Sequence, residues 1–203
     1  MAWDTERTRR RLLEAGARQF AAGGFSAARM EAIGRDAGVN KERVYRYFGD
    51  KRGLYAAVLS DQLDSLLDGA DIRGTGAAAM GAYAGELFDH FQENPIPARL
   101  LAWESLELEQ PAAAEHRARL CAQRATAIQA ALPELNQNSA QHLLLSIVTL
   151  AASWWTLSHL ADVILAGRTD DTQRRNAVVR QAIDLANAAT TANAPGTPPS
   201  HPR

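Results

Sequence analysis

Apolar residues recur at intervals of three and four along most of the chain, which is the spacing of one face of an α-helix. Runs of β-branched residues with period-two alternation, the pattern of a strand, do not occur. Alanine, the strongest helix former, supplies 40 of the 203 residues, and no proline precedes Pro95. The pattern therefore predicts an all-α protein.

The beginning of the chain divides into one long and two short predicted helices. The long helix begins near Asp4 or Thr5, either of which is a good N-cap, and ends at the pair Gly23-Gly24. The second helix occupies residues 26–37, with Ser26 as its expected N-cap.

A tight turn, Gly38-Val39-Asn40, separates the second helix from the third, which spans only residues 41–48. Gly38 supplies the left-handed backbone that ends one helix, and Asn40 caps the next through its side-chain oxygen. Asp50 is expected to cap the helix that follows.

The rest of the chain carries further helical patterns separated by Gly, Pro and Asn-rich breaks. A Pro-rich tail from residue 193 onward is expected to be disordered. The predicted helices span residues 54–67, 75–93, 97–109, 111–132, 139–166 and 171–190.

Composition places the chain among ordinary globular proteins, with 46% hydrophobic and 22% charged residues. Cys121 is the only cysteine, which excludes an internal disulfide and a multi-cysteine metal cage. No secretory leader or membrane-spanning apolar run is evident, so we expect a cytoplasmic protein without cofactor or metal.

The net charge of −1 hides a strong asymmetry along the chain. Residues 1–55 carry 12 Lys and Arg against 7 Asp and Glu, whereas the remainder carries 10 against 16. A basic head joined to an acidic body indicates that the head binds a polyanion, although a solvated helix face produces the same count.

Two short helices joined by a Gly-containing turn, behind a longer helix, have the arrangement of a helix-turn-helix. In that unit the second helix lies in the major groove of DNA, so its outer face must be polar. The outer face of residues 41–48 meets this demand with Lys41, Glu42, Arg43 and Arg46. The inner face offers Val44 and Phe48 for packing.

The head resembles the N-terminal domain of TetR-family repressors over roughly residues 5–58. The matching positions are Phe20, Gly24-Phe25, Ile33, Ala37-Gly38-Val39-Asn40-Lys41, Val44-Tyr45, Tyr47-Phe48, Lys51 and Leu54-Tyr55.

The resemblance implies roles for positions in and next to the third predicted helix, residues 41–48, which would be the recognition helix. It implies that DNA bases are contacted by Lys41, Glu42, Val44 and Arg46, and DNA phosphates by Asn40, Tyr45, Tyr47 and Lys51. Packing is an alternative role for Tyr45 and Phe48.

Ala28 departs from the family, which usually has a Thr here that caps the second helix and touches a phosphate. Glu42 is also unusual, and it could accept from a cytosine amino group or repel the backbone.

For the body, the resemblance implies a helical domain that senses a small hydrophobic or amphipathic effector and forms a homodimer. The last two predicted helices, 139–166 and 171–190, are typical of the pair that builds a dimer interface. Large or polar residues within apolar helices are candidates for the effector pocket, although core packing explains the tryptophans equally well: Phe91, Trp103, Glu104, Glu107, Trp154, Trp155 and His159.

The resulting hypothesis is a regulator with a DNA-binding domain at 1–55 and a ligand-binding and dimerisation domain at 56–192. It would bind a palindromic operator as a dimer, act as a repressor as the family implies, and leave the operator when an effector binds. Two other classes stay open: an architectural DNA-binding protein without a ligand, and a helical-bundle enzyme with a phosphorylated substrate. Against the enzyme, no Glu-x-x-His pair occurs, and the only histidine within five residues of Cys121 is His116.

Overall fold

The computed structural model describes residues 2–68, 70–168 and 170–193, and within these ranges every regular element is an α-helix. The all-α prediction is confirmed. The predicted tail lies outside the described residues except for Asn193, which is the last residue of a helix. The helices are α1 (Ala2–Ala27), α2 (Met30–Asp36), α3 (Lys41–Phe48), α4 (Lys51–Asp68), α5 (Gly76–Glu93), α6 (Ile96–Glu107), α7 (Ala114–Ala131), α8 (Gln137–Thr156), α9 (Ser158–Leu165) and α10 (Asp171–Asn193).

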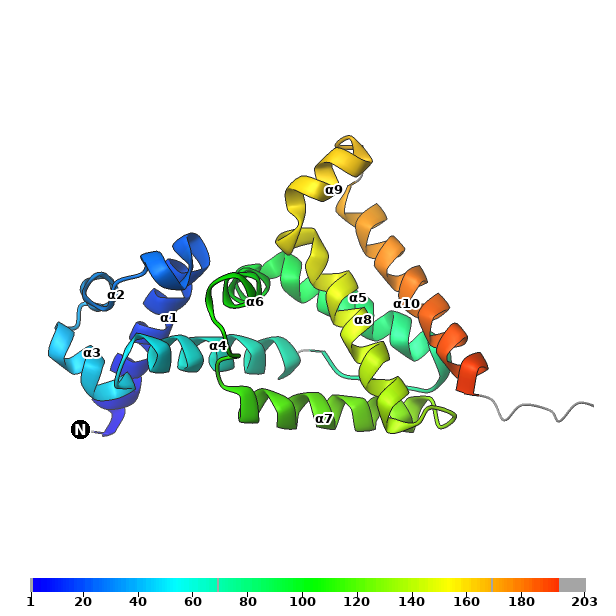
Figure 1. Ribbon diagram of the computed structural model, residues 1–203, viewed down its shortest axis with the longest axis horizontal. Helices are drawn as coiled ribbons and strands as arrows, with labels where there is room; N and C mark the ends of the chain where they lie inside the picture. Colours follow the sequence, from blue (N-terminus) through cyan, green and yellow to red (C-terminus); the bar gives the residue numbers. More distant parts are fainter. Residues whose placement is uncertain (1, 69, 169, 194–203) are drawn as a thin grey trace, which may run out of the picture.

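Helices α1, α2 and α3 form a head at one end of the molecule, and α5 to α10 form the body (Figure 1). Helix α4 runs without interruption from the head into the body. The domain boundary predicted after residue 55 therefore falls inside a continuous helix.

The end of α1 confirms one sequence prediction and corrects another. Gly24, with φ of 79° and ψ of −178°, breaks the helix at the predicted glycine pair. The prediction of Ser26 as the N-cap of the second helix is wrong, because α2 begins at Met30 and its N-cap is Arg29. Arg29 is extended and makes no side-chain capping hydrogen bond, so this helix begins uncapped.

The turn between α2 and α3 follows the prediction closely. Gly38 has a φ of 64°, the left-handed conformation expected at the end of a helix. The Oδ1 atom of Asn40 accepts a hydrogen bond from the Arg43 N–H at 3.0 Å, and Asp50 Oδ1 accepts from the Gly53 N–H at 2.7 Å. Both predicted caps are therefore confirmed.

The long helix predicted over residues 139–166 is instead two helices, α8 and α9, which meet at an angle of 84° at Leu157. The apolar pattern continues through the bend with neither Gly nor Pro, so no local signal marks it. Among the described helices, none alone has the length and hydropathy of a membrane span, and only this bent pair reaches them together.

Close packing joins the layers of the fold. A Cβ atom at Gly16 of α1 would lie 2.9 Å from the Val58 Cγ2 atom of α4, so the glycine allows the two helices to approach.

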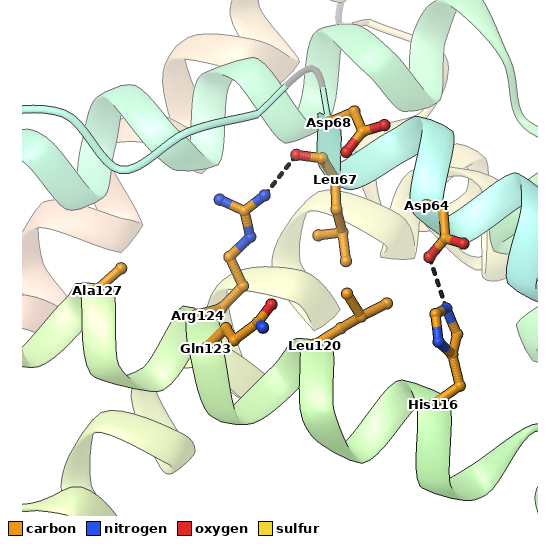
Figure 2. Close-up of a pocket in the computed structure, with 8 residues that line it drawn as sticks. All are labelled: Asp64, Leu67, Asp68, His116, Leu120, Gln123, Arg124 and Ala127. Carbon is orange, nitrogen blue, oxygen red and sulfur yellow. Dashed lines mark hydrogen bonds and ion pairs between the residues drawn. The ribbon is translucent and has the colours of Figure 1, made fainter.

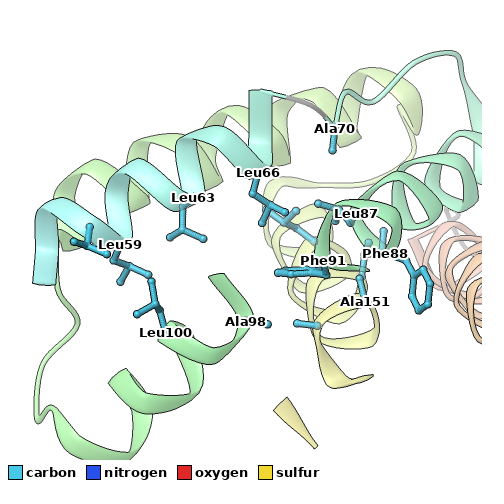
Figure 3. Packing of buried hydrophobic residues seen from close by; sticks show 14 of the residues in the cluster. Leu59, Leu63, Leu66, Ala70, Leu87, Phe88, Phe91, Ala98, Leu100 and Ala151 are labelled. Atoms are coloured by element: carbon cyan, nitrogen blue, oxygen red, sulfur yellow. The ribbon is translucent and has the colours of Figure 1, made fainter. Parts of the chain in front are cut away.

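In the body, α4, α5, α6 and α8 share a core (Figure 3). Residues of that core include Leu59, Leu63, Leu66, Leu87, Phe88, Phe91, Ala98, Leu100 and Ala151.

Candidate nucleic-acid interface and its link to the body

The outer face of α3 presents the polar residues that the sequence analysis assigned to DNA. Lys41, Glu42 and Arg46 are exposed, and Asn40 is exposed at the N-terminus of the helix. The N-terminus of a helix favours binding of a phosphate. The exposed polar face of α3 can therefore contact a polyanion.

Val44 lies on the opposite side of α3 and is completely buried. A Cβ at Gly34 of α2 would lie 2.9 Å from Val44 Cγ2, so the two short helices pack as closely as a glycine permits. The role of base contact predicted for Val44 is therefore wrong, because its side chain is enclosed by the core of the head.

The two tyrosines of α3 differ in their surroundings. Tyr45 is 41% exposed, so its hydroxyl is accessible from solvent. The Tyr47 hydroxyl donates to the carbonyl oxygen of Thr5 at 3.2 Å, and the Arg43 guanidinium lies 6.0 Å from the Tyr47 ring. Tyr47 therefore connects α3 to the beginning of α1.

The Lys51 ammonium is directed at the last turn of α1 and the short connection from α1 to α2. It donates to the carbonyl oxygens of Ser26 at 3.2 Å and Ala28 at 3.1 Å, and it lies 4.6 Å from the centre of the Phe25 ring. These contacts hold the connection to the start of α4. They give Lys51 a structural role that the sequence did not reveal, while its predicted phosphate contact stays a prediction.

Helix α6 of the body also contacts the end of α1. The Glu107 Oε2 atom accepts a hydrogen bond from the Ser26 N–H at 2.9 Å, and Trp103 Nε1 donates to the Ala21 carbonyl at 3.3 Å. A Cβ at Gly24 would lie 2.8 Å from both side chains, so the kink at this glycine makes room for them. Trp103 and Glu107 thus join head and body.

Glu104, one turn before Glu107, connects α6 to α7. Its side chain is buried, and its carboxylate accepts hydrogen bonds from Arg117 at 2.7 and 2.8 Å and from the Ala112 N–H at 2.7 Å. A buried carboxylate held by a guanidinium is strongly oriented. The chain of contacts therefore runs from Ser26 through α6 to α7.

Tyr55 supports this junction from α4. Its hydroxyl donates to the Leu100 carbonyl of α6 at 2.6 Å, and its ring lies edge-on to Phe20 and Phe25. Burial, with smaller contributions from the nearby Glu104 and Glu107 carboxylates, raises the pKa of Tyr55 well above its usual value. The phenol is therefore neutral and acts as a donor.

The residues proposed for an effector pocket do not gather around one cavity. Phe91 is buried and packs on Trp155, with ring centres 5.8 Å apart. Trp154 lies beside an apolar groove next to α9, and His159 is exposed on α9. Together with Trp103, Glu104 and Glu107 at the junction, these seven residues occupy separate places, and their part in effector binding stays a prediction.

A groove that the sequence analysis missed lies between α4 and α7 (Figure 2). The only sequence signal was the spacing of Asp64 and Asp68, which places two carboxylates on one face of α4. His116 and Arg124 reach across from α7. These residues are far apart in the sequence, so only the fold brings them together.

Large apolar side chains are exposed on each of the last three helices. They lie on α8, on α9 and the bend before it, and on α10, and α9 buries no residue at all. Such a surface is typical of an interface with another protein chain. Its residues are Leu145, Leu157, Leu160, Val163, Ile164 and Leu185.

Two family models match the chain. The one described as bacterial regulatory proteins, tetR family, matches residues 12–58, which lie in the head and the start of α4. The one described as tetracyclin repressor-like, C-terminal domain, matches residues 79–184, which are most of the body.

A curated relative, the HTH-type transcriptional repressor SCO4008 of Streptomyces coelicolor, is 34% identical over 111 residues. The matched region is 52% of this chain and 54% of that repressor, so the chain spans about half the length of this relative.

Solved structures extend the likeness over the body. The putative transcriptional regulator SCO4942 from Streptomyces coelicolor has a TM-score of 0.71 and 30% identity, with 88% of this chain and 97% of that chain covered. The regulator FadR from Bacillus subtilis, solved in complex with stearoyl-CoA, has a TM-score of 0.63 and 14% identity, covering 86% and 97%. At 14% identity, the likeness to FadR shows only that the two proteins share a fold.

Proposed function

The chain belongs to the TetR family of bacterial transcriptional regulators, and from that premise we propose that it is a repressor that leaves its operator when a small molecule binds the body. Enzymatic activity is not part of this proposal, because the relatives are transcriptional regulators. The architectural alternative differs in one respect, which is that it needs no response to a ligand.

One observation carries the proposal: α3 combines an exposed polar face with a completely buried Val44. The buried face holds the helix rigidly on α2, while the polar face remains available to a major groove. We assign base contacts to Lys41, Glu42 and Arg46, and phosphate contacts to Asn40, Tyr45, Tyr47 and Lys51.

We propose that the protein binds DNA as a homodimer through the surface of α8, α9 and α10. The exposed leucines and isoleucine of these helices support this assignment, because their burial against a second copy is favourable. A two-fold axis there would place two α3 helices about 34–36 Å apart, one turn of DNA, and would select a palindromic operator.

Control by an effector requires that the ligand bind one orientation of the heads better than the other. The contacts of Glu107 with Ser26, and of Lys51 with Ser26 and Ala28, support a path for this control. A shift of α4 or α6 in the body changes the position of the connection that leads into α2.

The test is selection of bound sites from a random duplex library, followed by affinity measurements at two salt concentrations. We expect a palindrome with half-sites about one helical turn apart and a nanomolar affinity. Weak binding without sequence preference would contradict the repressor. Specific binding to a single, asymmetric half-site would contradict the dimer.

A further inference from the structure

The two residues of α3 that point farthest from the rest of the head are Glu42 and Arg46. Successive residues of an α-helix are rotated by about 100°, so the residues two positions before and after a given residue lie about 160° away from it. Val44 is completely buried and therefore marks the inner side of α3. Glu42 and Arg46 are both exposed, and they form one stripe on the opposite side of the helix.

Side chains on the flank of α3 are already engaged within the head. The Arg43 guanidinium lies 6.0 Å from the centre of the Tyr47 ring, and the Tyr47 hydroxyl donates to the Thr5 carbonyl. Glu42 and Arg46, by contrast, have no hydrogen bond or ion pair within the described part of the chain. This is so even though a Glu four residues before an Arg is well placed for a salt bridge. Both charged groups are therefore available to a partner of the head.

The Glu42 carboxylate can recognise only a hydrogen-bond donor. It lies in the first turn of α3, where the helix dipole favours negative charge, and an ionised carboxylate accepts hydrogen bonds without donating any. In the major groove the cytosine N4 amino group is a donor, whereas guanine and thymine present acceptors. Adenine presents its N6 amino group beside the N7 acceptor, which repels a carboxylate. Cytosine is therefore the base that suits Glu42 best.

The Arg46 guanidinium has the complementary chemistry. It carries donors only, in a planar arrangement that fits the O6 and N7 acceptors of guanine. Four residues of a helix advance by about 6 Å, and base pairs repeat about every 3.4 Å. Glu42 and Arg46 therefore reach base pairs one or two steps apart, and each of these pairs is G·C.

The position of Glu42 decides between the two roles that the sequence leaves open for it. Phosphates line the rims of the major groove, whereas base edges form its floor. When α3 lies in the groove, a side chain directed away from the buried Val44 points to the floor, and the flanks of α3 face the rims. The carboxylate is thus held away from the phosphates. A base without a donor would leave it desolvated and unpaired, so Glu42 also discriminates against the wrong bases.

We propose that Glu42 determines the specificity of the operator by accepting a hydrogen bond from the N4 amino group of a cytosine, one or two base pairs from a guanine bound by Arg46. This inference rests on the proposed function, because it requires that α3 lie in the major groove. It adds the identity of two bases in each half-site, which the fold alone does not determine.

The experiment compares the operators that the unmodified chain and Glu42→Gln select from a random duplex library. The unmodified chain should select half-sites with a C·G pair at one fixed position. A glutamine side chain pairs with the N6 and N7 atoms of adenine, so Glu42→Gln should select A·T there and leave the other positions unchanged. In competition binding, each protein should prefer its own operator to the other by about tenfold.

Removal of a single amino group tests the contact itself. An operator in which pyrimidin-2-one replaces the selected cytosine lacks only the N4 amino group of that base. The unmodified chain should bind this operator about tenfold more weakly than the selected one. Glu42→Ala should bind the two operators equally, because the amino group and the carboxylate act as one coupled pair.

Glu14→Gln is the matched control for the change of charge. Glu14 is an exposed carboxylate of α1 that pairs with Arg10 beside α4, away from α3. Glu14→Gln removes the same charge from the head as Glu42→Gln does, and it should select the same operator as the unmodified chain. Circular dichroism shows whether each variant keeps its helices.

Several outcomes would overturn the role of Glu42. These are an operator without a fixed cytosine, an unchanged operator for Glu42→Gln, and equal sensitivity of Glu42→Ala and the unmodified chain to loss of the amino group. If the unmodified chain selects a palindrome and any of these is found, the repressor stands and the assignment of Glu42 fails. Binding without sequence preference by the unmodified chain would contradict both.

Discussion

Glu107 and Ser26 are 81 positions apart in the chain, yet the Glu107 carboxylate accepts a hydrogen bond of 2.9 Å from the Ser26 N–H. This contact places a body side chain on the segment that leads into the helix-turn-helix. The kink at Gly24 belongs to the same arrangement, because a side chain there would collide with Glu107 and Trp103. The orientation of the head is therefore set in part by α6.

The first prediction concerns this contact. Glu107→Ala removes the acceptor of the Ser26 N–H and should lower the free energy of unfolding by about 0.5–1.5 kcal/mol, as for one hydrogen bond. It should also weaken operator binding and reduce the response to an effector, because α6 no longer holds the head. Glu107→Gln keeps an acceptor and should restore much of both. The measurements are urea denaturation and operator titration.

Glu109→Ala is the matched control, since Glu109 is an exposed carboxylate two residues farther along the chain. It should change neither stability nor the effector response. If Glu107→Ala kept a full response to the effector, the proposed path through α6 would be contradicted.

The second prediction separates the two faces of α3. Val44→Ala should lower the free energy of unfolding by about 1–3 kcal/mol, because it leaves a cavity in the head, and should not change base preference. Arg46→Ala should leave stability nearly unchanged and relax discrimination at one or two base pairs by about 1–3 kcal/mol. Thermal unfolding and binding to a set of operators with single substitutions measure both effects. A change of base preference in Val44→Ala would contradict the buried role.

The third prediction tests the two roles of Lys51. Lys51→Ala leaves two carbonyl oxygens without their donor, so the unfolding midpoint should fall. If Lys51 also contacts a phosphate, DNA binding should weaken equally on all sequences, and the salt dependence should become shallower by about 0.9 in slope. We expect both effects in a titration against salt. A lower midpoint with an unchanged slope would restrict Lys51 to holding the connection between α1 and α2.

The sequence was sufficient for the parts of the fold that local chemistry determines. The turn at Gly38 and the caps at Asn40 and Asp50 each depend on residues within four positions, so their roles could be recognised. No breaker residue marks the bend at Leu157, so residue types near it could not predict it. Contacts such as that of Glu107 with Ser26 cannot be inferred from spacing, because no periodicity relates residues so distant.

The candidate site shows the same division. The exposed face of α3 follows from helical periodicity, and so does burial of Val44, which the inner-face pattern indicated and the resemblance obscured. The sequence suggested Trp103 and Glu107 only as candidates for the effector pocket, whereas the structure places both side chains against the head. A sequence pattern identifies a face, whereas only the fold identifies what covers it.

The fourth prediction concerns the proposed dimer. Leu145 of α8 is 64% exposed, and Leu145→Glu would place a charge in the proposed interface. We expect this variant to sediment as a monomer and to lose most of its operator affinity, since each half-site is then bound alone. Leu106→Glu is the control, because Leu106 is 76% exposed on α6, outside the proposed interface. A dimer that survives Leu145→Glu, or one lost in Leu106→Glu, would contradict the assignment.

The fifth prediction uses the two buried tyrosines. Burial raises the pKa of Tyr83 to about 12, from an ordinary value near 10. Between these pH values the unfolded chain loses its phenolic proton while the folded chain keeps it, so the free energy of unfolding falls as the pH rises above about 10. The loss from Tyr83 should reach about 2–3 kcal/mol by pH 12. Tyr55 should contribute in the same direction, because its pKa is also raised by burial.

Phenylalanine variants distinguish the two groups. Tyr83→Phe removes a hydroxyl without a hydrogen-bond partner among the described residues, so stability at neutral pH should be unchanged or slightly higher. Tyr55→Phe leaves the Leu100 carbonyl without its donor and should cost about 1 kcal/mol at neutral pH. Each variant should lose less stability than the unmodified chain between about pH 9 and pH 12 in urea denaturation. If Tyr83→Phe retained the full alkaline loss, the phenol of Tyr83 would not be its source.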